Sequence, residues 1–324
     1  MRREEFEWLE RQVHKLKNVM DALHDFDLSE YETYEIHPWT PLKLICLMWW
    51  LSIYTHIIPN YFKNYWYIDL FSGPGLNFVR ETGDYLPGSP ILACNSYKPF
   101  TQYIFIEENR QRCKSLKRIL SHLNFNNYKI YCRDCHTVIS NLHINADHSF
   151  IFADCEKPSH IKWKTIEKLL SKPSDMLIVF HTIFAYRELK SARSTRRDSK
   201  VLTEMFGDDS WRRASDGEEL LDMFSNKLQS SFKRINFTHP IKIKGKYSYH
   251  IILACRKSKG KRDYTDAWIE LGEKMTDLRD KHVEIALKIC QGKAKLEDFR
   301  EFFGQRTLED FREFFRQRTL ENFV

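Results

Sequence analysis

The residues best suited to chemistry form a glycine-rich turn after a short apolar run. The run Tyr65 to Phe71 (YWYIDLF) is aromatic and β-branched, and Ser72-Gly73-Pro74-Gly75 follows it. Glycine lets a backbone turn tightly and approach a ligand closely. The spacing G-x-G lacks the third glycine of a dinucleotide fingerprint, and the sequence contains no G-x-x-x-x-G-K-[ST] motif. The turn therefore predicts a ligand site that is neither a nicotinamide site nor a P-loop, with a purely structural βα turn as the alternative.

Carboxylates follow the ends of four predicted strands. Asp69 ends the first strand, and Glu107-Glu108 follow the second. Arg133-Asp134 follow the third strand and Asp154-Cys155-Glu156 the fourth. Acids at strand ends can accept hydrogen bonds from ribose hydroxyls, as in dinucleotide-binding folds, and from an adenine amino group. Because such a ring of carboxylates would repel a polyphosphate, the pattern favours adenosine joined to a cationic or amino-acid tail.

Cysteines offer further alternatives. The thiolate of Cys155 could attack C6 of a pyrimidine and activate C5, but a buried, inert thiol is the interpretation that we favour. Cys132-x-x-Cys135-His136 matches a haem-attachment pattern, although the sequence shows no export signal. A zinc site would need more ligands, and His143 and His148 stand at unsuitable spacing. We therefore predict no metal.

The elements that must position these residues alternate between short apolar runs and helix-patterned segments. Near-continuous apolar strands between helices predict a parallel sheet covered on both faces. Two apolar runs near the end of this domain, 235–244 and 247–255, flank Gly245 and predict an antiparallel hairpin at the edge of the sheet. The fold class is thus α/β, with a Rossmann-like, mostly parallel sheet. The predicted strands are 65–71, 102–106, 128–132, 149–153, 176–181, 235–244 and 247–255.

Helical segments are predicted on both sides of this domain. Residues 1–37 carry apolar positions every three or four residues, which indicates an amphipathic helix. The apolar stretch 44–58 is short for a membrane span and contains polar residues, so we predict a buried helix and no membrane contact. A twelve-residue repeat, LEDFREFFGQRT at 296–307 and LEDFREFFRQRT at 308–319, predicts a lengthened amphipathic helix. The predicted organisation is a helical region over 1–60, the α/β domain over 61–260 and a helical tail over 261–324.

Composition limits the class of protein. The 324 residues carry a net charge of +7, and 42% are hydrophobic, which excludes a disordered chain. No signal peptide is recognisable at the start of the sequence, so we expect the eight cysteines to be free thiols and the protein to be cytoplasmic.

The basic segment 187–200 (RELKSARSTRRDSK) is predicted to be a loop, either merely solvated or in contact with nucleic-acid phosphates through Arg187, Arg193, Arg196 and Arg197.

Several ordered motifs together resemble a known family. Beyond the glycine turn they include the T-x-x-K-L of Thr40 to Leu44, Gly88-Ser89-Pro90, Phe152-Ala153-Asp154 and Phe206-Gly207. Over about residues 37 to 256 the sequence resembles class I S-adenosylmethionine-dependent methyltransferases, and more narrowly the three-Cys-motif partner protein family (TcmP). The name of that family implies a partner protein that carries the three-cysteine motif. The chain departs from the family after the fourth strand, where it has Asp154-Cys155-Glu156 in place of an aspartate–proline pair.

The resemblance implies roles for individual residues. S-adenosylmethionine would be the cofactor, with Glu107 at its ribose and Asp134 at its adenine. Asp154 would lie near the methyl group and the acceptor, where Asp154 or Glu156 would act as catalytic residues. The turn residues Asp69, Phe71, Gly73 and Gly75 would hold the methionine side of the cofactor.

Two functions follow from these observations. The first is a methyltransferase that acts on nucleic acid, RNA or DNA, in concert with a three-cysteine-motif partner. The alternative is a non-catalytic subunit that keeps the fold as a scaffold and docks another protein through its N-terminal helices or its phenylalanine-rich tail.

Overall fold

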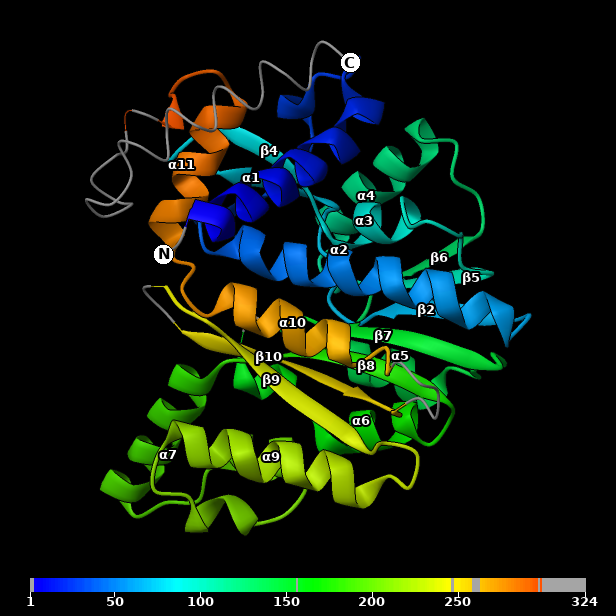
Figure 1. Ribbon diagram of the computed structural model, residues 1–324. Coiled ribbons are helices and arrows are strands. Elements are labelled where there is room, and N and C mark those ends of the chain that lie inside the picture. Colours follow the sequence, from blue (N-terminus) through cyan, green and yellow to red (C-terminus); the bar gives the residue numbers. More distant parts are fainter. Residues whose placement is uncertain (1–2, 156, 246–247, 258–262, 297, 299–324) are drawn as a thin grey trace.

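The computed structural model describes residues 3–155, 157–245, 248–257, 263–296 and 298 (Figure 1). Within these residues a seven-stranded sheet has the strand order β6-β5-β2-β7-β8-β10-β9. Its first five strands are mutually parallel, and β10 is antiparallel to both of its neighbours. The predicted Rossmann-like α/β sheet with an antiparallel C-terminal hairpin is therefore confirmed. The strands are β2 (Tyr65–Asp69), β5 (Gln102–Ile106), β6 (Tyr128–Tyr131), β7 (His148–Ala153), β8 (Ser174–Phe180), β9 (Phe237–Ile243) and β10 (Tyr249–Cys255).

The sheet separates two hydrophobic cores. Successive side chains of a strand point to opposite faces, so Tyr67 belongs to one core and Ile68 to the other. Because both faces are covered, every residue of β7 and β8 is buried. This explains why these strands appear in the sequence as continuous apolar runs.

Helices cover both faces of the sheet (Figure 1). The first core includes residues of α1 (Arg3–Asn18), α2 (Thr40–Ile57), α3 (Ser89–Cys94), α4 (Arg110–His122), α10 (Asp266–Met275) and α11 (Asp280–Cys290). The second core includes residues of α5 (Cys135–Asn141), α6 (Trp163–Leu170), α7 (Thr182–Thr195), α8 (Lys200–Phe206) and α9 (Gly217–Ser231). Short 3-10 turns are η1 (Val19–Leu23), η2 (Leu28–Glu30), η3 (Ile58–Asn60), η4 (Pro158–His160) and η5 (Ser210–Arg213).

The apolar helix α2 lies inside the protein. Thr40–Asn60 has the length and hydropathy of a membrane-spanning helix, but more than half of it is buried by the rest of the chain. Trp50 and Tyr54 are almost fully buried and contact Trp268 and Phe150. The predicted buried helix is confirmed, and it forms one cover of the sheet.

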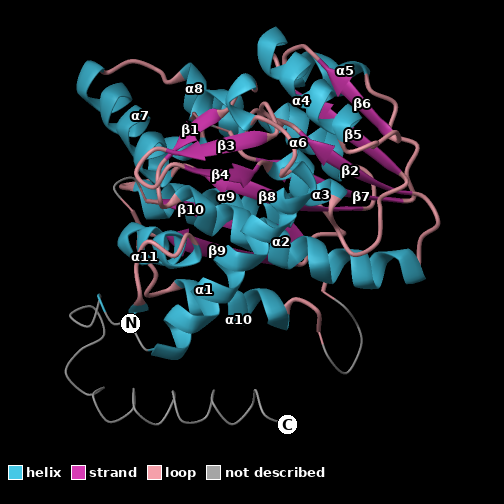
Figure 2. Ribbon diagram, turned by 90° about the horizontal axis from the view of Figure 1, so that it is seen from above, coloured by secondary structure: helices cyan, strands magenta, loops and turns pink. Residues whose placement is uncertain are grey.

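A second, small sheet was not predicted. It joins β1 (Tyr34–Ile36), β3 (Leu76–Val79) and β4 (Asp84–Pro87), which lie side by side in Figure 2. Strands of three or four residues are too short to show a periodicity, and β1 pairs with a segment about forty residues away. The predicted amphipathic helix over 1–37 accordingly stops at Asn18, before a 3-10 turn and β1.

The prediction of a loop over 187–200 was wrong. Helix α7 continues to Thr195, because Ala185, Leu189 and Ala192 form a buried stripe at helical spacing beneath the charged residues. Most of the predicted phenylalanine-rich repeat, including the copy at 308–319, lies outside the described residues.

A buried carboxyl predicts a pH dependence of stability. Asp175 on β8 is almost fully buried, and burial raises its pKa to about 8. Its neighbour His148, with Nε2 at 4.0 Å from Asp175 Oδ1, has a pKa lowered to about 4 by burial and by the charge of Arg234. Both groups are therefore neutral at pH 7 and do not form an ion pair.

The contribution of Asp175 to stability should fall as the pH rises between about 4 and 8, because in this range the folded state holds a proton on Asp175 that the unfolded state has released. His148, whose pKa is lowered, contributes the opposite trend below about pH 6.5, so the effect of Asp175 is read from the difference between the wild type and a variant. Asp175→Asn should remove this trend and stabilise the protein at pH 7 by about 2 kcal/mol. Urea denaturation of both proteins at pH 5, 7 and 8.5 measures the effect. Parallel curves for the two proteins would refute the assignment.

Candidate functional site

A cavity of about 460 Å³ lies over the carboxyl ends of the parallel strands. Its walls come from β1, the start of α2, the turn after β2, the segments after β5, β6 and β7, the start of α7, and Tyr249 of β10. Ligands of open α/β sheets bind at this edge. The structure brings Phe71, Gly75, Glu107, Asp134 and Asp154 together around this one cavity.

The glycine turn requires its glycines. Gly73 and Gly75 have φ angles of +62° and +89°, a conformation that residues with a Cβ rarely adopt. A Cβ on Gly73 would lie 2.3 Å from Cε2 of Tyr34. Asp69 supports the turn from below, because its carboxylate accepts hydrogen bonds from the N–H of Phe71 at 3.2 Å and the hydroxyl of Tyr67 at 3.1 Å.

Asp69 does not line the cavity, although the sequence predicted that it would contact a cofactor. The residue is fully buried, and burial raises its pKa to about 7 against the opposing effect of hydrogen bonds from Ser89, Phe71 and Tyr67. Gly73 also lies beneath the lining residues, with its N–H directed to Glu107. These two residues therefore shape the turn, whereas Phe71 and Gly75 face the cavity.

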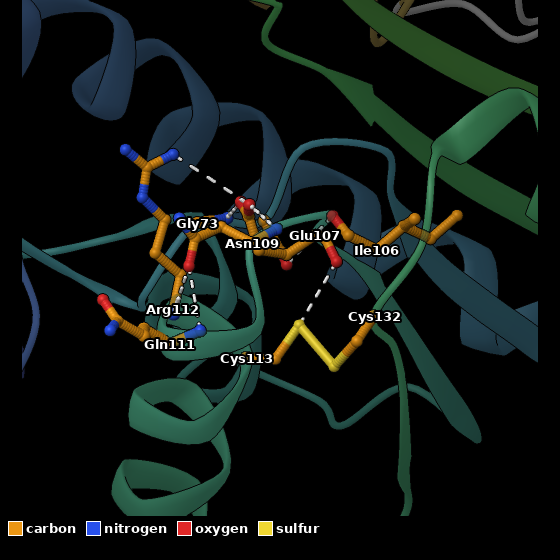
Figure 3. Close-up of a disulfide and its surroundings, with 9 residues drawn as sticks. Gly73, Ile106, Glu107, Asn109, Gln111, Arg112, Cys113 and Cys132 are labelled. Carbon is orange, nitrogen blue, oxygen red and sulfur yellow. Dashed lines mark hydrogen bonds and ion pairs between the residues drawn. A yellow bond between two sulfur atoms is a disulfide. The ribbon is translucent and has the colours of Figure 1, made fainter.

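Glu107 joins the second strand to the glycine turn (Figure 3). Its Oε2 accepts from the N–H of Gly73 at 3.1 Å, and its Oε1 accepts from the N–H of Asn109 at 2.8 Å. These bonds fix the carboxylate at the cavity wall and leave further lone pairs of its oxygens for a ligand. Its neighbour Glu108 also lines the cavity but is exposed. Of the two acids, Glu107 is the buried one and the one bonded to the turn, and its role at a ribose stays a prediction.

Arg112 and Tyr34 close one side of this wall. Nη1 of Arg112 donates to the hydroxyl of Tyr34 at 2.6 Å, and the guanidinium lies 4.1 Å from the centre of the Tyr34 ring. The same Nη1 is 4.0 Å from Oε1 of Glu107. The cation therefore links β1 to the Glu107 wall. Sequence reasoning assigned no role to Arg112 or Tyr34, because β1 was not predicted.

Asp134 stands at the start of α5. Its Oδ1 accepts from the N–H of Thr137 at 2.9 Å and from the hydroxyl of Thr137 at 3.0 Å. Burial raises its pKa, but these hydrogen bonds and the charges of His136 and Lys162 outweigh burial and hold the pKa below its ordinary value. Asp134 is thus an anionic helix cap at the cavity rim, with its second oxygen available to an amino group.

Asp154 follows β7 and forms an ion pair with Lys43 of α2 inside the cavity. The next residue, Cys155, is fully buried, its Sγ lies 3.6 Å from the carbonyl oxygen of Val179, and burial raises the pKa of its thiol. These observations support the inert-thiol interpretation over the nucleophile alternative. Glu156, the other predicted catalytic residue, lies outside the described residues.

Two cysteines form a disulfide, which corrects the expectation of free thiols throughout. Cys113 of α4 is bonded to Cys132, which follows β6 (Figure 3). Cys113 Sγ also lies 3.2 Å from the carbonyl oxygen of Glu107. The pairing depends on α4 running back along the strands, and cysteine spacing alone does not reveal such pairs. The cytoplasmic location remains a prediction.

The disulfide also bears on the metal alternatives. Cys132 is unavailable as a ligand in the Cys132-x-x-Cys135-His136 pattern. The potential ligand atoms of Asp134, Cys135 and His136 lie within 4.8 Å of one another, but burial raises the pKa of the Cys135 thiol to about 12. A thiolate, the form that binds metals, is therefore disfavoured at this position.

Cys132→Ser should lower the free energy of unfolding by about 3 kcal/mol, because the bond closes a loop of nineteen residues in the unfolded chain. Thermal unfolding with and without reductant measures this. The reductant should lower the midpoint of the wild type and leave that of Cys132→Ser unchanged. Equal midpoints for the wild type in both conditions would show that the bond does not contribute.

The four predicted nucleic-acid-binding arginines lie on or just after α7, outside the cavity lining. The guanidinium of Arg193 donates to the backbone carbonyls of Ala214, Ser215 and Arg212, so its charge is used within the chain. Arg187 is exposed, and its guanidinium lies 5.4 Å from the ring centre of Phe184, which lines the cavity. Arg196 ends the helix with a φ of +52°, and the neighbouring Arg197 is exposed.

Sequence reasoning missed several residues of the cavity. Lys43 belongs to the T-x-x-K-L motif, so a signal for it was present. His181 and Phe184 follow the fifth parallel strand, and the same strand-end logic that selected Asp154 could have found them. Tyr249 is the first residue of β10, which runs antiparallel to β8. A search for residues that follow strands therefore does not find it.

No protein-family model and no curated protein sequence matches this chain. Solved structures with a similar fold include a Legionella pneumophila protein of family DUF519, with 13% identity, coverage of 70% of this chain and 89% of the other, and a TM-score of 0.43. An rRNA methylase from Streptococcus thermophilus shares 12% identity over 60% of this chain and 87% of its own, with a TM-score of 0.33.

TYW2 from M. jannaschii, solved in complex with AdoMet, shares 14% identity over 59% of this chain and 68% of its own, with a TM-score of 0.33. At such low identities and TM-scores, these likenesses assign neither an activity nor a ligand to the chain.

Proposed function

We propose that the protein is an S-adenosylmethionine-dependent methyltransferase. The observation that carries the proposal is the fixed carboxylate of Glu107, tied to the N–H groups of Gly73 and Asn109 at the wall of the cavity. A carboxylate held in this way can accept hydrogen bonds from the two hydroxyls of a ribose. Asp134 at the next strand end would accept from the adenine amino group.

The motifs and the placed carboxylates fit this cofactor better than a nucleoside triphosphate. Glu107, Glu108, Asp134 and Asp154 line the cavity together with Lys43, Arg112, Arg133 and Lys162, so its lining carries both signs of charge, and the glycine turn offers no P-loop for phosphates. A sulfonium ion carries a positive charge, so the carboxylates that lie beside it would lower its energy. The turn at Phe71 and Gly75 would hold the methionine part of the cofactor.

The chain would act chiefly by positioning. S-adenosylmethionine supplies an activated methyl group, and the protein aligns an acceptor atom with the carbon–sulfur bond. Asp154 at the end of the fourth strand faces the space beyond the turn, where it can orient the acceptor or take a proton from it. Tyr249 is buried beside this space, and burial together with the negative charge of Asp154 raises its pKa, so its hydroxyl stays protonated and donates to the backbone carbonyl of Trp39 at 3.4 Å.

We propose nucleic acid as the acceptor class. Arg133 lines the cavity, and Arg187 stands exposed above Phe184. Arg112 and Lys162 also line the cavity but form ion pairs with Glu107 and Glu204. Cations around a site supply the sequence-independent part of affinity for a phosphate backbone. The net charge of +7 agrees with such a partner.

We also propose membership of the three-Cys-motif partner family, which rests on the ordered motifs of the sequence. A second hollow of about 530 Å³ is lined by residues of α1 and α2 and by the segment from Leu92 to Tyr97. Tyr97 on its rim is 64% exposed. This surface shares helix α2 with the cofactor site and is our candidate for contact with the partner protein.

A methyl-transfer screen tests the proposal. The full-length protein is incubated with radiolabelled S-adenosylmethionine and pools of RNA, DNA or protein, with and without the three-cysteine partner. Label should enter a nucleic-acid pool, and Asp154→Asn should abolish its incorporation. Binding of S-adenosylhomocysteine without any transfer would favour the scaffold function, and label in the protein pool would contradict the acceptor class.

A further inference from the structure

The ion pair between Lys43 and Asp154 places a cation where a methyl acceptor would lie. Lys43 is the only lysine or arginine of α2, a helix that is otherwise almost entirely apolar. Its side chain is 19% exposed and that of Asp154 is 18% exposed, and both line the cavity. The lysine therefore projects from the apolar helix toward the loop after β7.

The groups around this pair come from four elements. Tyr249 of β10 and the Cys155 thiol are buried beside it, and burial is the main cause that raises the pKa of each. Asp69 lies below, and the negative charge of Asp154 contributes to the raised pKa of Asp69. His181 and Phe184 face the cavity from the start of α7. Among these neighbours Lys43 is the permanent cation.

The sign of that charge discriminates between acceptor atoms. A neutral amino or ring nitrogen becomes positively charged as it takes the methyl group, and a nearby ammonium ion would oppose this change. A hydroxyl oxygen that gives up its proton as it attacks gains negative charge, and an ammonium ion stabilises it. While Asp154 is ionised it offsets the charge of Lys43, but once it has taken the hydroxyl proton the ammonium ion acts alone on the attacking oxygen. The pair thus favours an oxygen nucleophile that gives its proton to Asp154 over a ring nitrogen that has no proton to give.

We propose that Lys43 and Asp154 form an acceptor site for a hydroxyl oxygen, namely the ribose 2′-hydroxyl of RNA. This inference rests on the proposed methyltransferase function and names its acceptor. The hydroxyl oxygen bonds to the methyl carbon, the carbon–sulfur bond breaks, and its electron pair stays on sulfur. The hydroxyl proton passes to the carboxylate of Asp154, so the products are a methyl ether and S-adenosylhomocysteine. DNA, which lacks the 2′-hydroxyl, is excluded as an internal acceptor.

Product analysis tests this inference. The full-length protein and radiolabelled S-adenosylmethionine are incubated with bulk unmodified RNA transcripts or with DNA of the same sequences, and the products are digested to nucleosides and identified by mass spectrometry. We expect the label in ribose-methylated nucleosides from RNA and none from DNA. Label on a base, transfer to DNA, or no transfer to RNA by a protein that binds S-adenosylhomocysteine would overturn the inference.

Variants separate a catalytic lysine from a structural ion pair. Lys43→Met should lower transfer by about 100-fold, and Lys43→Arg, which keeps the cation, should recover part of this loss. Affinity for S-adenosylhomocysteine, measured by calorimetry, should change little in both variants. Lys17→Met is the matched control, because Lys17 forms a comparable pair with Asp84 at 2.8 Å outside the cavity. Its transfer rate should stay within about twofold of the wild type.

Equal losses in Lys43→Met and Lys17→Met would show that a broken ion pair, and no acceptor chemistry, is the cause, and would overturn the inference. A wild-type protein that fails to bind S-adenosylhomocysteine would instead overturn the proposed methyltransferase function itself.

Discussion

Glu107→Ala should weaken the binding of S-adenosylhomocysteine by roughly 1.5–3 kcal/mol, which is about 10- to 150-fold in the dissociation constant. The variant removes the acceptor that we assign to the ribose hydroxyls. It also leaves the N–H groups of Gly73 and Asn109 without their carboxylate, so the turn itself loses a fixed partner. Isothermal titration calorimetry measures the affinity, and circular dichroism verifies that the variant is folded.

Glu108→Ala is the matched control for this experiment. Glu108 has the same charge and also lines the cavity, but it is exposed and does not bond to the glycine turn in the described structure. We expect its affinity to remain within about threefold of the wild type. Equal losses for the two variants would mean that the total negative charge of the cavity, and not a fixed ribose acceptor, determines binding.

Gly73→Ala should both destabilise the protein and impair ligand binding. A φ of +62° costs a residue with a Cβ about 1–2 kcal/mol. In addition, the new Cβ would lie 2.3 Å from Tyr34 Cε2, so the ring must move away from its contact with Arg112. We expect the free energy of unfolding to fall by about 2–4 kcal/mol and the affinity for S-adenosylhomocysteine to fall by more than about tenfold.

Gly83→Ala separates backbone strain from the clash. Gly83 has a similar φ of +73°, but a Cβ there would meet no atom within 4 Å. It should therefore show only the backbone cost of about 1 kcal/mol and no loss of ligand affinity. If Gly73→Ala behaves like Gly83→Ala in both measurements, the turn is an ordinary βα connection and not a ligand cradle.

The main sheet could be predicted because its strands are buried on both faces. Gln102–Ile106 matches the predicted run without change, and the antiparallel hairpin around Gly245 follows from two apolar runs. Strand order across the sheet and the pairing of β1 with β3 depend on contacts far apart in the sequence. The arginines after Tyr186 concealed the buried stripe of α7, because in that part of the helix only Leu189 and Ala192 are buried and the charged residues outnumber them.

The candidate site could be predicted where strand ends determine it. Glu107, Asp134 and Asp154 each follow a strand, and parallel strands end at one edge of the sheet. Tyr34 and Tyr249 come from an unpredicted strand and an antiparallel strand, and only the tertiary structure shows that they face this edge. Lys43 belongs to a motif that the sequence shows, but the motif does not place it beside Asp154. The burial of Asp69 could not be foreseen either, since a strand-end acid can face the cavity or support the turn.

The central claim is that the carboxylates beside the glycine turn hold a sulfonium nucleoside, and calorimetric titration of the full-length protein with S-adenosylmethionine and S-adenosylhomocysteine tests it most directly. The account predicts one saturable site per chain for either compound, with affinity reduced in Glu107→Ala and retained in Glu108→Ala. No binding of either compound, or tighter binding of adenosine triphosphate at the same site, would contradict it.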